Sequence, residues 1–65
     1  MNLPNDPLLL MSVVNTKLRD YYADLDALCD DLNEDRAALE EKLAAIGYIY
    51  DKQRNQFITG KKGST

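Results

Sequence analysis

The chain has 65 residues, of which 45% are hydrophobic and 29% are charged, and its formal net charge is −3 at pH 7. This length allows one domain whose core supplies only about 3–5 kcal/mol, and the composition excludes a disordered chain. The longest apolar run, Leu8 to Met11, is too short to cross a bilayer, and the N-terminus lacks the basic and long apolar regions of a secretion signal, so we expect a cytoplasmic protein.

The first helix is predicted to run from Pro7 to about Tyr21. Asp6 can cap its free N–H groups, and Pro7 suits the first helical position because it has no N–H group to leave unpaired. A broad apolar face is predicted to point into the core, and it contains Leu10, Met11, Val14, Leu18, Tyr21 and Tyr22. Leu9 and Val13 form a second apolar stripe on the opposite side, and another surface must shield these side chains from solvent.

Two shorter helices are predicted from about Asp24 to Leu32 and from Arg36 to Ile46. Asp24 and Asp35 can cap them, Asn33 suits a left-handed turn between them, and Gly47 ends the second one. This order of helix, tight turn and helix is typical of a helix-turn-helix unit. Glu34 departs from that pattern, because its turn position normally carries an apolar residue.

A β-hairpin is predicted to follow, with strands at residues 48–50 and 56–58 joined by a turn in which Asn55 can adopt a left-handed conformation. Alternation places Tyr48 and Tyr50 on one face with Phe57, and Ile49 and Ile58 on the other. The fold class is therefore mainly α with a C-terminal β-hairpin: a three-helix, winged helix-turn-helix-like domain over residues 1–58, followed by a disordered tail at 59–65. The predicted core comprises Leu10, Val14, Leu18, Leu25, Leu28, Cys29, Leu32, Leu39, Leu43, Ile46, Tyr48 and Phe57.

Two sequence blocks, LPxDPxxLxSxVNxKLRD near the N-terminus and GYxYDxxxNxF near the C-terminus, resemble a family of short bacterial proteins known as domain of unknown function 4250. The resemblance covers about residues 1–58. It implies a bacterial source and no established activity, and the family offers no catalytic or binding residues to transfer to this chain.

No catalytic, metal-binding or cofactor-binding constellation is apparent in the sequence. The chain has one cysteine and no histidine, so an internal disulfide and the usual zinc ligand sets are excluded. Cys29 lies between Leu25 and Leu32 at helical spacing, which predicts a buried structural thiol rather than a nucleophile. The acidic residues of 24–35 lack the central Gly and the closing Glu of a calcium loop. We therefore expect neither an enzyme nor a cofactor.

A DNA-binding or transcription-associated function is the alternative that the predicted architecture suggests. Residues 24–46 carry eight acidic and two basic residues, a net charge of −6, which repels phosphate from the would-be recognition helix. Nucleic acid would instead meet the hairpin, the tail and the end of the first helix, with contacts from Lys17, Arg19, Lys52, Arg54, Lys61 and Lys62.

A non-catalytic protein-interaction module is the function that the sequence favours. The small size of the domain and the second apolar stripe predict self-association as a homodimer, with contacts from Leu8, Leu9 and Val13. The other interpretation is that Leu3, or the outer hairpin face with Ile49 and Ile58, covers the stripe within one monomer. The sequence does not identify a protein partner.

Overall fold

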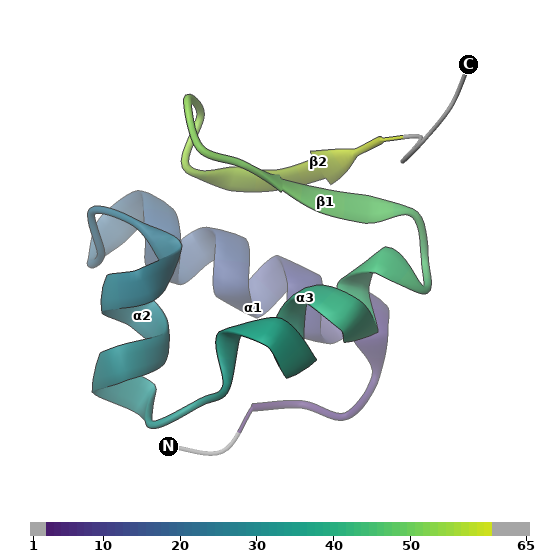
Figure 1. The fold of residues 1–65 in the computed structure, drawn as a ribbon, viewed down its shortest axis with the longest axis horizontal. Coiled ribbons are helices and arrows are strands. Elements are labelled where there is room, and N and C mark those ends of the chain that lie inside the picture. The colour runs from purple at the N-terminus through teal and green to yellow at the C-terminus, as the bar shows by residue number, and fades with distance from the viewer. Residues whose placement is uncertain (1–2, 61–65) are drawn as a thin grey trace.

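Three helices are followed by an antiparallel β-hairpin in the computed structural model, which describes residues 3–60 (Figure 1). The elements are α1 (Pro7–Asp20), α2 (Leu25–Leu32), α3 (Arg36–Ala44), β1 (Tyr48–Asp51) and β2 (Gln56–Thr59). The hairpin lies over the helices, with β1 along α3 and β2 along α1. The predicted class, mainly α with a C-terminal hairpin, is confirmed, whereas the specific likeness to winged helix-turn-helix proteins stays a prediction.

The helix ends follow the local chemistry of capping and turn residues. Asp24 Oδ1 accepts a hydrogen bond from Ala27 N–H at 2.8 Å, and Asn33 and Gly47 have the positive φ angles, 57° and 87°, that were expected of them. Asp35 occupies the N-cap position of α3, but its side chain makes no capping hydrogen bond.

Helix α3 ends at Ala44, two residues before the predicted end at Ile46. At Ile46 and Gly47 the backbone hydrogen bonds join residues three apart instead of four. Ile46 N–H donates to the Leu43 carbonyl at 3.2 Å, and Gly47 N–H donates to the Ala44 carbonyl at 3.0 Å. These bonds turn the chain out of α3 and into β1.

Nine of the twelve predicted core residues are buried, and the other three, Leu32, Ile46 and Tyr48, are partly buried against them. The prediction that Tyr21 lies on the core face of the first helix is wrong, because the exposed fraction of this residue is 74%. The reason is that α1 ends at Asp20 and the backbone of Tyr21 leaves the helical conformation, with φ at −126°, so its side chain no longer follows the buried face.

The hairpin has the predicted faces. Tyr50 pairs with Phe57, and their ring centroids lie 5.6 Å apart on the helix side, while Ile49 pairs with Ile58 on the other face. Thr59 pairs with Tyr48 inside β2, so the expected start of the disordered tail at residue 59 is wrong. The rest of the predicted tail, from residue 61, lies outside the described residues.

Asn55 ties the hairpin turn to the end of α1. Its backbone has a φ of 54°, and its Nδ2 donates hydrogen bonds to the carbonyl oxygens of Leu18 at 3.1 Å and Tyr22 at 3.0 Å. Its Oδ1 accepts a hydrogen bond from the Tyr50 hydroxyl at 2.6 Å. One side chain therefore fixes the turn, β1 and the C-terminus of α1 relative to one another.

Candidate functional site

The first half of α1 presents an uncovered apolar surface. Leu8 and Leu9 are 58% and 53% exposed, and Val13, one turn further along, is partly buried. Asp6 holds the start of this helix by accepting a hydrogen bond from Leu8 N–H at 3.3 Å. The three predicted self-association residues lie in the first half of α1, outside its buried face of Leu10, Val14 and Leu18, and we call them the α1 surface.

Nothing within residues 3–60 covers Leu8 and Leu9. Leu3, the first alternative cover, instead packs against the core and borders a cavity with Leu39 of α3. Ile49, from the second alternative cover, is itself 37% exposed on the far face of the hairpin. The interpretation in which the monomer buries this stripe is therefore wrong for the residues that the structure describes.

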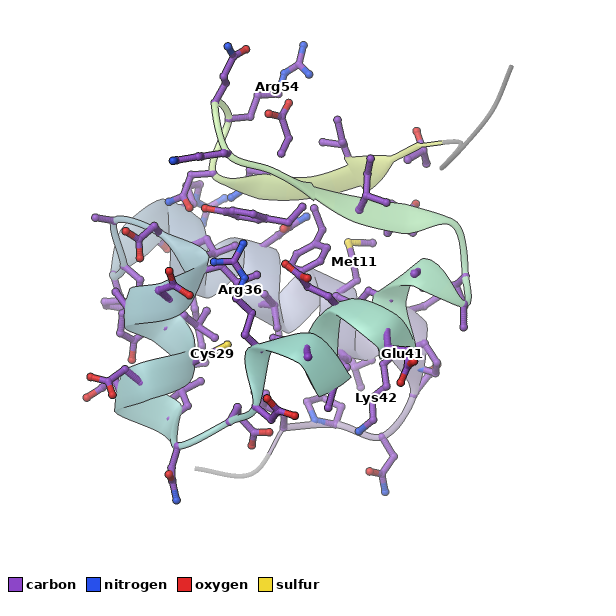
Figure 2. The ribbon with its side chains drawn as sticks, in the orientation of Figure 1. Met11, Cys29, Arg36, Glu41, Lys42 and Arg54 are labelled. Carbon is purple, nitrogen blue, oxygen red and sulfur yellow. The ribbon has the colours of Figure 1, made fainter. Side chains whose placement is uncertain are left out.

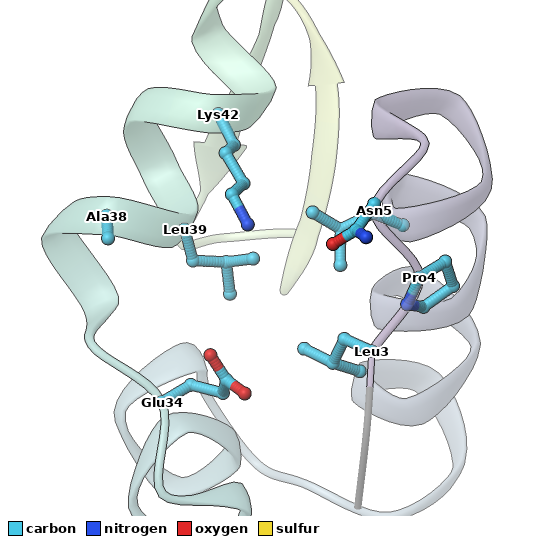
Figure 3. A pocket seen from close by; sticks show the side chains of 8 residues that line it. Leu3, Pro4, Asn5, Glu34, Ala38, Leu39 and Lys42 are labelled. Atoms are coloured by element: carbon cyan, nitrogen blue, oxygen red, sulfur yellow. The ribbon is translucent and has the colours of Figure 1, made fainter.

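The cavity beside Leu3 was not predicted from the sequence. It has a volume of about 400 Å³ and lies between the N-terminal segment and α3 (Figure 3). Lys42 and Glu34 point into it from different sides in Figure 3, and both side chains are exposed to solvent. It is therefore an open, polar hollow, lined in part by Glu34 of the segment between α2 and α3.

Cys29 is buried, as expected, with an exposed fraction of 5%. Burial raises the pKa of its thiol, although the nearby Arg36 guanidinium acts in the opposite direction. Figure 2 shows the sulfur directed inward from α2.

Within residues 3–60, no group of three or more His, Cys, Asp and Glu side chains is placed to hold a metal ion.

Two of the four described basic residues of the alternative nucleic-acid surface are paired with neighbouring aspartates. Arg19 pairs with Asp20 at 3.0 Å at the end of α1, and Arg54 pairs with Asp51 at 3.0 Å in the hairpin turn, where it points away from the helices (Figure 2). Lys17 Nζ lies 6.0 Å from the centre of the Tyr21 ring. Lys52 is exposed at the end of β1, and Lys61 and Lys62 lie outside the described residues.

Arg36, the first residue of the would-be recognition helix α3, has two carboxylate partners. The Arg36 guanidinium donates hydrogen bonds to Asp26 at 2.7 Å and to Glu40 at 2.9 Å, and these two carboxylates raise the pKa of Arg36. This guanidinium is therefore engaged within the molecule.

No helix among residues 3–60 combines the length and the apolar character that a membrane crossing requires.

Comparison with known proteins places the chain in a family but assigns it no activity. No curated protein and no solved structure matches it. The family model of Domain of unknown function (DUF4250) matches residues 4–57, which is most of the chain, and the protein therefore belongs to this family.

Proposed function

We propose that this domain is a non-catalytic protein-interaction module that associates with a second copy of itself through the α1 surface of Leu8, Leu9 and Val13. The observation that carries the proposal is the pair of large aliphatic side chains, more than half exposed, at adjacent positions of one helix. Scattered exposed leucines are ordinary, but two of them in the same turn of a helix, with Val13 one turn beyond Leu9, concentrate apolar area on one short segment.

The charge distribution favours a second copy as the partner at this surface. Two copies of an acidic chain repel each other wherever they bring carboxylates together. Residues 7 to 16 of α1 contain no charged side chain, so two copies can meet there without that cost. The exposed Ser12 and Thr16 lie between Leu8 and Leu9 on the outward side of the helix, where their small hydroxyl side chains can form hydrogen bonds within the contact.

A nucleic-acid-binding function is the second proposal that the architecture allows, and the charges weigh against it. Arg19 and Arg54, two of the four described basic residues that it invokes, are paired with neighbouring aspartates. Binding to duplex DNA requires several cations on one face to release counterions from the phosphates. We therefore rank self-association first.

The test is the mass in solution, by light scattering or sedimentation, of the wild type and of a double variant with Leu8→Asp and Leu9→Asp. These positions lie in the first turn of α1, where carboxylates interact favourably with the helix dipole, so the variant is expected to fold. We expect the wild type to exceed the mass of a monomer and the double variant to have a lower mass. A monomeric wild type at high micromolar concentration would refute the proposal.

A matched control keeps the added charge and moves it elsewhere. Ala23 and Ala27 are exposed at the start of α2, so Ala23→Asp with Ala27→Asp adds the same two negative charges without touching the α1 surface. The control should retain the mass of the wild type. If it dissociates as readily as the Leu8 and Leu9 variant, net charge rather than the α1 surface governs the association.

A further inference from the structure

The outer edge of β1 is open along its backbone. Phe57, in β2, directs its N–H and C=O groups away from β1, because both are bonded to the Asn15 side chain of α1 at 2.7 and 3.0 Å. The residue opposite Phe57 is Tyr50, so the pair is of the type that exchanges no backbone hydrogen bonds. Tyr50, and by alternation Tyr48, must therefore direct their N–H and C=O groups outward.

These outward groups have no partner among residues 3–60. Neither the backbone bonds nor the side-chain bonds of this region include the peptide groups of Tyr48 or Tyr50 on the outer side. The equivalent edge of β2 at Phe57 is bonded to Asn15. The edge of β2 is therefore occupied by α1 at Phe57, whereas the edge of β1 can accept another strand at both Tyr48 and Tyr50.

We propose that β1 pairs antiparallel with β1 of a second copy, across a two-fold axis at Ile49, to make a four-stranded sheet. In this register Tyr48 of one copy faces Tyr50 of the other, and each such pair can exchange two backbone hydrogen bonds. Ile49 faces Ile49 of the second copy as a close pair, and its side chain is 37% exposed on the outer face of the hairpin. The open edge is thus complementary to itself.

The flank of α3 beside this edge leaves space for the second copy. A groove of about 620 Å³ runs between α3 and β1, and Ala37 and Ala44 lie on its helix side. Both alanines are exposed, and their small side chains allow a second α3 to approach closely beneath the extended sheet. A bulky or branched side chain at either position would close this approach.

The charges along the groove favour the antiparallel arrangement. Arg36, at the start of α3, lies 5.4 Å from the centre of the Tyr50 ring, and the end of α3 leads through Gly47 into Tyr48, so α3 and β1 run in opposite directions. Lys52 therefore lies at the end of the groove where α3 starts. Antiparallel pairing carries Lys52 of the second copy to the other end, opposite Ile46.

A cation is favoured at that other end. The last carbonyl groups of α3 give it a partial negative charge, and Glu41 lines the same groove one turn earlier. Lys42, in the last turn of α3, points into the cavity beside Leu3 and does not line the groove. Each copy thus offers a lysine to the Glu41 of the other, twice across the axis. This pattern is what identifies a second copy, rather than an unrelated peptide, as the occupant.

This contact is independent of the α1 surface, and both can exist in one assembly. A chain with two different self-complementary surfaces forms particles larger than a dimer, and these close as a tetramer when the two axes cross at right angles. The test therefore uses the Leu8→Asp, Leu9→Asp background, which removes the α1 surface. We expect this background to be dimeric, and a monomeric background at high micromolar concentration would overturn the β1 proposal alone.

Charge reversal with mixing tests the contact without depending on any one variant. In that background, Lys52→Glu and Glu41→Lys should each weaken dimerisation about tenfold or more, because like charges then face each other. Mixed in equal amounts, the two variants restore opposite charges at both ends of the interface, so the heterodimer should form. Two variants that stay monomeric after mixing, or that never dissociate, would refute the assigned charges.

The register is tested by crosslinking. Ile49→Cys places two thiols opposite each other at the axis, in a close pair where an oxidant should form an intermolecular disulfide on a non-reducing gel. Ile58→Cys is the matched control, since it lies on the same face one strand further from the axis. Efficient crosslinking of Ile49→Cys alone supports the register. Equal crosslinking of both variants, or of neither, overturns it.

Discussion

The side chain of Asn15 makes two hydrogen bonds to the backbone of Phe57, 42 residues further along the chain: its Oδ1 accepts from the N–H at 2.7 Å, and its Nδ2 donates to the carbonyl oxygen at 3.0 Å. The amide of Asn15 thus occupies the position that a peptide group of a third strand would take. Gln56 strengthens the same contact, since its Nε2 donates to the Asn15 carbonyl at 2.9 Å.

Replacing Asn15 with Ala is expected to destabilise the domain by about 1–3 kcal/mol, because the N–H and C=O groups of Phe57 lose their partners in a partly buried place. In a domain whose core supplies so little stability, this is a large fraction of the total. Urea titration followed by circular dichroism measures the change. Thr16→Ala, at an exposed position one residue further along α1, is the control and should stay within about 0.5 kcal/mol of the wild type.

Two asparagines with nearly the same backbone conformation should respond differently to glycine. Asn33 and Asn55 have φ angles of 57° and 54°, which glycine adopts without strain. Only Asn55 is seen to bond through its side chain, to Leu18, Tyr22 and Tyr50. Asn55→Gly is therefore expected to cost about 1–3 kcal/mol and Asn33→Gly close to nothing. Equal melting temperatures of the two variants would show that these bonds add no net stability.

Cys29 should react slowly with a thiol reagent in the folded state, since it is 5% exposed and burial raises its pKa. A raised thiol pKa also means that the folded state holds its proton more tightly than the unfolded chain does. Stability linked to this thiol is therefore present below the ordinary pKa of 9.0 and is lost as the pH rises through the folded value. Labelling should accelerate to the unfolded rate in denaturant, and fast stoichiometric labelling without denaturant would contradict burial.

The domain is expected to bind duplex DNA weakly or not at all at physiological salt. Arg19, Arg36 and Arg54 are each paired with carboxylates, which reduces the positive charge available to phosphates. Fluorescence anisotropy with a random duplex, over a range of salt concentrations, measures the affinity. Submicromolar binding that disappears in a Lys52→Ala, Arg54→Ala variant would reverse the ranking of the two proposed functions.

The turns and helix ends could be predicted from the sequence because their chemistry is local. Asp24, Asn33, Gly47 and Asn55 each determine the backbone within a few residues, and all four behave as expected. Tyr21 was misplaced because the helical pattern was extended by one residue past the real end of α1. In such short elements a shift of one residue moves a large side chain from the core into solvent.

The long-range polar bonds could not be predicted in the same way. The pairing of Asn15 with Phe57 depends on how the hairpin lies over α1, which no periodicity expresses. One signal was present: Asn15 lies on the flank of the buried face of α1, beside Met11 and Leu18, where a polar side chain needs a partner. Asn15 belongs to the first of the two blocks that resemble the family, and Phe57 to the second, so the blocks meet at these bonds.

The candidate interaction surfaces were predictable to different degrees. The exposure of Leu8 and Leu9 follows from helical spacing, since a helix that is apolar nearly all round cannot bury every side. The open edge of β1 does not follow from any pattern in the strands. Alternation assigns side chains to faces, but only the tertiary structure decides which edge of a hairpin is covered.

The bonds between Asn15 and Phe57 also determine how far a sheet built from this hairpin can extend. A strand that pairs on both sides can recruit copies without end, which is the route to fibrils. Here Asn15 of α1 occupies the edge of β2 at Phe57, so two molecules joined through β1 have each used the edge that lacks such a partner. Growth by strand addition stops at two chains, and an Asn15→Ala protein would be the variant to examine for filaments.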